Sequence, residues 1–218
     1  MKVAIIGASG FIGSKILAEA LSHNHKVTAI VRHPKRVPHH RNLTVSKSNI
    51  LWRHKLAQIL KGHDAVISSW NTPRGVTGPQ VYDRWVDGNS SILAAVNESG
   101  VKRFLAVGGA SSLKTPEGIE LLDSPQFPKA FEPARPAMRG VRELFYMLKK
   151  EPELDWVFFS PAVMIVPGVR TGKYRLGTDR IVADAKGESR ISVEDYAVAM
   201  IDELEHPKHH RDRFTIGY

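Results

Sequence analysis

Three glycines near the start of the chain have a spacing that suits phosphate binding. Gly7, Gly10 and Gly13 lie between the apolar run at residues 3–6 and a stretch whose apolar residues recur at helical spacing. This context predicts a turn from a buried strand into a helix, where Gly7 permits the turn, Gly10 lets a pyrophosphate approach and Gly13 lets the helix pack closely. The amides and the dipole at a helix N-terminus favour an anion. We therefore predict a dinucleotide site in this turn.

The pattern departs from the usual dinucleotide fingerprint in one respect. Its first two glycines are one residue further apart than in G-x-G-x-x-G, and the alternative interpretation is a glycine-rich turn that binds nothing. A second apolar run follows on schedule at residues 26–31, as expected for the dinucleotide-binding arrangement. The context, more than the spacing, favours the cofactor site.

The residue after the second predicted strand bears on the choice of cofactor. NAD sites place an acidic residue here for the ribose hydroxyls, whereas NADP sites place an arginine nearby for the 2′-phosphate. This chain has Arg32, and a guanidinium fork suits a phosphate. The alternative is a solvated arginine at a strand end. We predict NADP(H) in preference to NAD(H), with His33, Lys35 or Arg36 as an auxiliary contact.

Ser111 and Ser112 are the residues that we predict to be catalytic. They follow the apolar run at residues 103–107, and a hydroxyl can polarise a substrate oxygen without changing its charge. The alternative is that they cap the loop. Tyr174 is a further candidate for a substrate contact, and simple packing is its alternative.

These side chains need elements that bring them together. Apolar runs predict strands at residues 3–6, 26–31, 43–45, 64–69, 103–107, 156–160 and 213–216. Helical spacing predicts helices from residue 12, at 53–60, 82–98 and 136–150, and from a capping box at Ser192 to Asp195 up to residue 204. Strands alternating with helices imply a doubly wound α/β Rossmann fold, with a parallel sheet covered on both faces.

Ligands of such sheets bind beyond the carboxyl ends of the strands, where the strand order reverses. Residues that follow the predicted strands should meet in this crevice. The cofactor-binding residues that we predict there are Gly7, Ser9, Gly10, Phe11, Ile12, Gly13, Arg32, Asn49, Ile50, Ser69, Trp70, Asn71, Gly108 and Gly109.

We predict a single NAD(P)-binding Rossmann domain over residues 1–218, with residues 161–192 as a small lobe on the substrate side. Residues 71–79 form a loop rich in Gly and Pro. The proline-rich loop at residues 113–133 is too long for a simple connector and is interpreted as a lid or substrate wall. Residues 167–177 and 180–183 indicate irregular or short β structure that covers the crevice.

Composition narrows the class of protein. The net charge is +9, but the basic residues are scattered rather than gathered into a nucleic-acid footprint. No cysteine, signal peptide or apolar run long enough to cross a bilayer is found, so we expect a cytoplasmic protein without a membrane partner. The histidine pairs at 39–40 and 209–210 lack matching ligands, and we assign no metal.

Four motifs, at residues 7–13, 107–112, 160–162 and 192–197, carry a family resemblance. In them the chain resembles the atypical short-chain dehydrogenase/reductase superfamily, in particular its compact NmrA-like and biliverdin-reductase-B-like NAD(P)H-binding members. The resemblance covers essentially the whole chain and implies a Rossmann fold and an NAD(P)H site that includes Pro161 and Ala162. It does not identify a substrate.

The usual catalytic pair of that superfamily is a tyrosine with a lysine four residues later. This chain departs from it, because Arg135 and Arg139 occupy the two positions and neither is a good proton donor at neutral pH. Arg139 is still predicted to hold the cofactor ribose. Tyr146 and Lys150 match the spacing, but Tyr146 lies eleven residues after Arg135, about 16 Å further along the helix, and is rejected.

We predict an NADPH-dependent reductase of a small carbonyl or conjugated compound, acting as a monomer or homodimer. The alternative is a non-catalytic NADP(H)-binding redox sensor that acts on a protein partner. The absent catalytic tyrosine favours the sensor, whereas the elaborate crevice loops and the two serines favour the enzyme.

Overall fold

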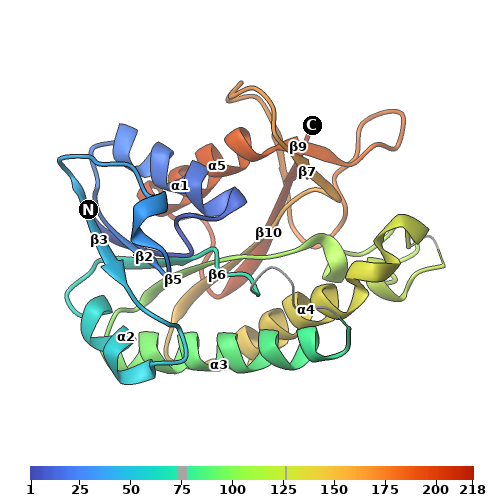
Figure 1. The fold of residues 1–218 in the computed structure, drawn as a ribbon. Helices are drawn as coiled ribbons and strands as arrows, with labels where there is room; N and C mark the ends of the chain where they lie inside the picture. The colour runs from blue at the N-terminus through green and yellow to red at the C-terminus, as the bar shows by residue number, and fades with distance from the viewer. Residues whose placement is uncertain (73–77, 126) are drawn as a thin grey trace.

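A mostly parallel sheet forms the centre of the computed structural model, which describes residues 1–72, 78–125 and 127–218 (Figure 1). The sheet has eight strands in the order β3-β2-β1-β4-β5-β6-β10-β8. Neighbouring strands are parallel up to β10, and β8 joins β10 in the antiparallel direction. The strands are β1 (Lys2–Ile6), β2 (Lys26–Val31), β3 (Leu43–Lys47), β4 (Ala65–Ser68), β5 (Arg103–Val107), β6 (Asp155–Ser160), β8 (Arg175–Gly177) and β10 (Asp212–Gly217).

Helices cover both faces of the sheet, as Figure 1 shows. Successive strand residues point to opposite faces, so Val3 and Ile5 join one core while Ala4 and Ile6 join the other. Helices α1 (Phe11–Ser22) and α5 (Val193–Glu205) pack on the first face. Helices α2 (Arg53–Leu60), α3 (Gln80–Ser99) and α4 (Arg135–Lys149) pack on the second. The prediction of a doubly wound α/β fold is confirmed.

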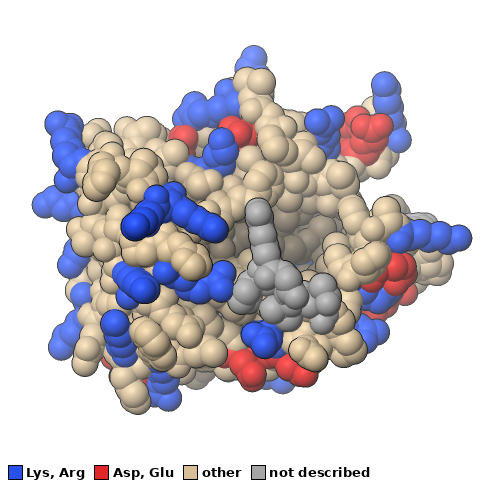
Figure 2. Space-filling model, in the orientation of Figure 1, with Lys and Arg blue, Asp and Glu red and all other residues tan. Residues whose placement is uncertain are grey.

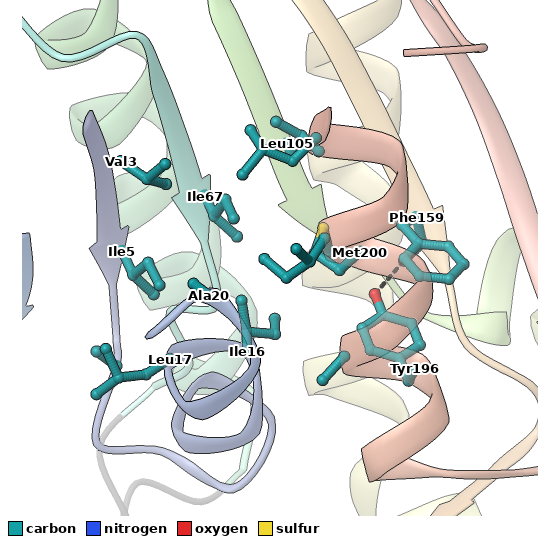
Figure 3. Packing of buried hydrophobic residues seen from close by; sticks show 14 of the residues in the cluster. Val3, Ile5, Ile16, Leu17, Ala20, Ile67, Leu105, Phe159, Tyr196 and Met200 are labelled. Carbon is teal, nitrogen blue, oxygen red and sulfur yellow. Dashed lines mark hydrogen bonds between the residues drawn. The ribbon is translucent and has the colours of Figure 1, made fainter. Parts of the chain in front are cut away.

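A buried tyrosine ties α5 to the carboxyl end of the sheet. The Tyr196 hydroxyl donates to the Phe159 carbonyl at 2.7 Å, and the two rings stack with centroids 4.2 Å apart (Figure 3). Complete burial raises the pKa of Tyr196 well above its ordinary value. The same carbonyl accepts a hydrogen bond from the Gly108 amide at 2.8 Å. One peptide oxygen thus connects β6, α5 and the turn after β5.

Several predicted elements have the observed bounds, including the strands at 26–31 and 103–107 and the helix at 53–60. The short strands were harder to predict. β7 (Met164–Val166) and β9 (Arg190–Ser192) pair in a separate two-stranded sheet, and neither was predicted. The β structure expected at 180–183 amounts to one bridge, between Arg180 and Lys114. Three-residue strands show too little alternation to stand out in a sequence.

The long segment between β5 and α4 is folded against the molecule. It contains the short helices η2 (Ala110–Ser112), η3 (Leu121–Asp123) and η4 (Lys129–Ala134). Its residues Leu122 and Phe127 form a small apolar cluster, which Val163 and Ile181 of the 161–192 segment also contact. This segment therefore forms a packed wall. Most of the loop predicted at 71–79 lies outside the described residues, as does residue 126 of the loop predicted at 113–133.

None of the described helices is both long enough and apolar enough to cross a membrane.

Candidate functional site

The glycine turn follows β1, and its three glycines differ in how much space surrounds them. Gly7 has a positive φ of 81°, and a Cβ on it would lie 2.5 Å from the Ser69 carbonyl oxygen. A Cβ on Gly13 would lie 2.3 Å from the Gly7 carbonyl oxygen. A Cβ on Gly10 would meet only that same oxygen, at 3.2 Å, and otherwise open space. Gly7 and Gly13 are thus required by the fold, whereas Gly10 leaves room for a ligand.

The turn lies at the reversal of the strand order. β1 pairs with β2 on one side and with β4 on the other. The strands β2 and β3 therefore extend the sheet to one side of β1, and the strands from β4 onward extend it to the other side. The Ser69 amide donates to the Ile6 carbonyl at 2.9 Å, which brings the residues after β4 beside the glycine turn. Gly10 is the N-cap of α1, whose first amides have no partner within the helix. This is the position at which open α/β sheets bind anionic ligands.

Basic side chains surround the neighbouring edge of the sheet. Arg32 follows β2, and Lys35 and Arg36 belong to the short helix η1 (Pro34–Arg36); all three are exposed. Within the described residues, none of the three forms an ion pair. Figure 2 shows Lys and Arg side chains on the left of the view, around the part where Figure 1 labels β2 and β3. These exposed cations are therefore available to bind a phosphate.

Asn49 and Ile50 follow β3. The Asn49 side-chain oxygen accepts a hydrogen bond from the Leu51 amide at 3.1 Å, which shapes the turn into α2. Ile50 is buried in the core beneath α2 and α3, and its carbonyl accepts from the Ser91 hydroxyl at 2.6 Å. A cofactor contact for either residue stays a prediction.

Trp70 anchors the segment after β4. Its ring lies edge-on to Trp85, with centroids 5.2 Å apart. A Cβ on Gly88 would come within 2.3 Å of the Trp70 ring, and one on Gly140 would come within 2.3 Å of Trp85. Glycines on α3 and α4 thus make room for both indoles. The next residue, Asn71, is exposed and accepts from the Thr72 hydroxyl at 3.3 Å.

The predicted catalytic serines lie in the turn after β5, and both are buried. The Ser111 hydroxyl donates to the Met138 carbonyl of α4 at 3.1 Å. Ser112 has no exposed surface, and its side-chain oxygen accepts from Arg213 Nη1 at 3.1 Å. A substrate contact for Ser111 requires its hydroxyl to turn away from Met138. A direct contact for Ser112 stays a prediction that its complete burial disfavours.

Gly108 and Gly109 allow this turn to pack closely. A Cβ on Gly108 would lie 2.5 Å from the Phe158 ring, and one on Gly109 would lie 2.9 Å from Val141 of α4. Pro161 and Ala162, which follow β6, are buried, and Ala162 belongs to the core on the α1 face. Their predicted cofactor contacts are left untested by this packing.

The two arginines at the positions of the usual catalytic pair have different surroundings. Arg135 donates to both Glu132 carboxylate oxygens, at 2.8 and 2.6 Å, and to the Leu122 carbonyl at 2.6 Å. It therefore fastens the wall segment to α4. Arg139 is exposed and forms no ion pair among the described residues. Because it follows Met138, which accepts from Ser111, Arg139 lies at the same end of α4 as the serine turn.

The two tyrosines considered in the sequence are both hydrogen-bonded to carboxylates. The Tyr146 hydroxyl donates to Glu120 at 2.8 Å, and burial together with this bond raises the pKa of Tyr146 to about 12. The Tyr174 hydroxyl donates to Asp202 of α5 at 2.8 Å, and burial raises its pKa as well. Neither hydroxyl is poised to give up a proton at neutral pH.

A cavity of about 730 Å³ lies between the wall segment and the 161–192 segment. Figure 2 shows a hollow between the part that Figure 1 labels β7 and β9 and the part that it labels α4. The polar residues at the cavity include Glu188 and Arg190. Its apolar lining comprises Pro116, Leu121, Pro128, Val163, Met164, Val166, Ile181 and Ala183.

Two of the buried charged residues, Arg213 and Asp195, have contacts that were not predicted from the sequence. Arg213 of β10 holds the Ser112 carbonyl at 2.7 Å, and a charged residue within an apolar strand was the available signal. Asp195 has no exposed surface and accepts hydrogen bonds from Thr171, Gly172 and Tyr218. These bonds lower the pKa of Asp195 against the effect of burial. Nothing in the local sequence indicated these distant partners.

Both histidines of the pair near the end of the chain lie within hydrogen-bond distance of carboxylates. His209 Nδ1 lies 2.8 Å from a Glu203 carboxylate oxygen, and His210 Nδ1 lies 3.0 Å from Asp155. Within the described ranges, no three or more His, Asp or Glu side chains are grouped in a way that could hold a metal ion.

Comparisons with known proteins agree with this geometry. A family model described as NAD(P)H-binding matches residues 7–207. The uncharacterized protein YwnB of Bacillus subtilis is 36% identical over 219 residues, which cover 99% of this chain and 98% of that protein. The structure of a putative epimerase from Bacteroides thetaiotaomicron is 47% identical, with a TM-score of 0.91 over 100% of this chain and 96% of that one. A putative NADH-flavin reductase from Streptococcus pneumoniae is 32% identical, with a TM-score of 0.85 over 100% and 99% of the two chains.

Proposed function

Because the chain belongs to the NAD(P)H-binding family, among the NmrA-like atypical short-chain dehydrogenases/reductases, we propose that it is an NADPH-dependent reductase of a small carbonyl or conjugated compound. The observation that carries this proposal is the open side of Gly10. The two neighbouring glycines are closed in by backbone, whereas a Cβ on Gly10 would meet only one backbone oxygen. The open space beside Gly10, at the N-terminus of α1, supports a pyrophosphate site there.

The preference for NADPH rests on charge. Arg32 lies after β2, where the 2′-phosphate of NADPH would come to rest, and Lys35 and Arg36 follow it in η1. No acidic residue occupies the position that would bind the ribose hydroxyls of NADH. An exposed arginine without an ion pair can form charge-assisted hydrogen bonds to a phosphate without breaking existing ones.

Bound NADPH would supply the hydride, solvent water would supply the proton, and the chain's own residues would orient the reaction. The turn at Gly10 would hold the pyrophosphate, and Arg139 would hold the nicotinamide ribose. The Ser111 hydroxyl, released from the Met138 carbonyl, would donate to the substrate oxygen and make the adjoining carbon a better hydride acceptor. Ser112, fixed to Arg213, would keep this turn in place.

The cavity beside the 161–192 segment supports an apolar substrate. Eight of its lining residues are aliphatic or proline, and polar groups stand at few positions. We propose that residues 161–192 act as the substrate-side lobe and that the wall segment closes the other side. The flavin in the name of one similar protein supports a conjugated substrate.

A redox sensor is the second candidate, and Arg135 favours it. This residue stands where the superfamily places its catalytic tyrosine, and its bonds to Glu132 and Leu122 give it a structural task instead. A protein of this kind would bind NADP(H) and pass the occupancy of the site to a partner.

A screen of NADPH oxidation separates the two functions. The purified chain is mixed with NADPH and a panel of carbonyl compounds, quinones and flavins, and loss of NADPH absorbance is followed. Gly10→Ala, which is expected to fold but not to bind the cofactor, supplies the background rate. Turnover above that background supports the reductase. If no compound is reduced, while NADPH changes the recovery of a protein partner in a pull-down, the sensor replaces it.

A further inference from the structure

A second cavity lies toward the amino-terminal ends of the strands, whereas the glycine turn follows the carboxyl end of β1. It has a volume of about 540 Å³ and is bounded by the end of α4, the start of β6 and the start of β10. β6 and β10 begin at this end of the sheet, whereas the predicted cofactor crevice lies beyond the strands' carboxyl ends. The residues that matter here are Lys114, Glu120, Phe145, Trp156, Asp179 and Arg213.

Arg213 is the central residue of this cavity. Only 6% of its surface is exposed, and its guanidinium lies over the Phe145 ring, 4.4 Å from the centroid. Nη1 donates to the Ser112 carbonyl and hydroxyl oxygens at 2.7 and 3.1 Å. Nε is buried without a hydrogen bond, and within the described part of the chain Arg213 has no ion pair. A buried cation thus has two neutral acceptors and no counterion.

Two of the nearby carboxylates are engaged with other cations, and the third binds backbone. Glu120 pairs with Arg142 at 3.1 Å and also accepts from Tyr146, while Asp179 pairs with Lys114 at 2.8 Å. Asp212 accepts from the backbone amide of Arg213 at 2.7 Å. Burial lowers the pKa of Arg213, against the opposing influence of Asp179 and Glu120. An uncompensated buried charge is costly, and an anion from outside would remove that cost.

Trp156, which lines the same cavity, carries a second unpartnered donor. Only 3% of Trp156 is exposed, and its buried Nε1 makes no hydrogen bond. The rings of Trp156 and Phe145 supply apolar walls beside these donors. The cavity therefore offers a cation and an N–H donor next to aromatic surface. This combination suits a ligand that joins a carboxylate to an aromatic body.

We propose that this cavity binds a small aromatic carboxylate, held by Arg213 and Trp156 and stacked against Phe145. The unpartnered nitrogens are covered by protein atoms, so the ligand reaches them when the Arg213 side chain turns toward the cavity. That movement loosens the bonds from Arg213 to Ser112, the neighbour of Ser111. The cavity is thus an effector site that acts on the serine turn. Binding itself does not depend on the proposed reductase activity.

An NMR titration of the ¹⁵N-labelled full chain tests the proposal with benzoate, and with benzamide as its neutral analogue of the same shape. Trp156→Phe assigns the Trp156 indole signal. With benzoate, the Trp156 indole and the Ser111, Ser112 and Leu113 amides are expected to shift along one binding curve. Benzamide should bind at least about tenfold more weakly, because it cannot form the charge-assisted bond.

Two arginine variants locate the contact. Arg213→Met should weaken benzoate binding at least about tenfold, whereas Arg53→Met should leave it nearly unchanged, because Arg53 lies on α2 outside the cavity and pairs with Glu98. Equal binding of benzoate and benzamide to the unaltered chain overturns the proposal, even if Arg213→Met fails to fold. A shift of the indole without the serine amides overturns the effector role, and the absence of any shift overturns the site.

Discussion

The three glycines of the first turn should respond very differently to the same substitution. Gly10→Ala is expected to fold normally and to lose NADPH, because its Cβ would point into open space and would meet only the Gly7 carbonyl oxygen, at 3.2 Å. Its φ of −81° suits any residue. Gly13→Ala and Gly7→Ala are expected to damage the fold itself. These variants therefore separate a ligand-binding glycine from two structural ones.

The magnitudes follow from the contacts. For Gly10→Ala, a slightly tight contact opposes the reduced entropy of the unfolded chain, about 0.4–1 kcal/mol, so the free energy of unfolding should change by less than about 1 kcal/mol. NADPH affinity should fall at least about 100-fold, as expected for losing two charge-assisted hydrogen bonds of about 1.5 kcal/mol each. Gly13→Ala places a Cβ 2.3 Å from a backbone oxygen and should cost about 1–3 kcal/mol or more.

Thermal unfolding and isothermal titration calorimetry measure the two effects on the same samples. At this chain length, each 1 kcal/mol corresponds to about 2–4 °C in melting temperature. The expected pattern is an almost unchanged melting temperature with lost binding for Gly10→Ala, and a clearly lower melting temperature for Gly13→Ala. If Gly10→Ala binds NADPH as the parent does, the pyrophosphate does not lie at this turn.

Three further predictions concern single side chains. Arg32→Ala should weaken NADPH binding about tenfold or more and leave NADH binding unchanged in calorimetry; an unaltered ratio contradicts the 2′-phosphate contact. Ser111→Ala should lower turnover of a substrate found in the screen, whereas Tyr146→Phe should not, and a large loss in a folded Tyr146→Phe would move the reaction to the other edge of the sheet. Burial lowers the pKa of His63 from its usual value of about 6.5, so below that pH the unfolded chain takes up a proton that the native state resists, and stability falls. Melting curves between about pH 7 and 5 should show this decline, and His63→Gln should reduce it.

The main sheet could be predicted because each strand carries its information locally. Residues 26–31 and 103–107 are continuous apolar runs, and their helices repeat apolar residues on one face. The lobe could not be predicted in the same way. β7 and β9 are three residues long and pair across more than twenty intervening positions, as in the register of Ile165 with Ile191.

The capping box correctly predicted the start of α5 but not the tertiary contacts of Asp195. Ser192 does cap α5, since its hydroxyl accepts from the Asp195 amide at 3.0 Å. The reciprocal bond from the Asp195 carboxylate is absent, because that group binds Thr171 and Gly172 of the lobe and Tyr218 beyond β10. Local spacing identified the helix start, but the partners of Asp195 depend on the tertiary fold.

In the candidate site, too, local features could be predicted and tertiary contacts could not. Backbone features, such as the turn at Gly7 and Gly10, follow from residue type and position in the chain. The orientation of side chains does not, and Ser111, Ser112 and Arg135 all have partners that no local pattern indicates.

The paired indoles between α3 and α4 also give the molecule a built-in optical probe. Trp70 stands at the end of β4 beside the glycine turn and rests against Trp85. Indole emission overlaps the absorption of a reduced nicotinamide, so NADPH in the crevice would quench this pair by resonance energy transfer, while its oxidised form would quench it far less. Occupancy and redox state of the cofactor could then be read in real time without a label. Replacing Trp52, which stands exposed at the start of α2, would remove a background emitter and sharpen that signal.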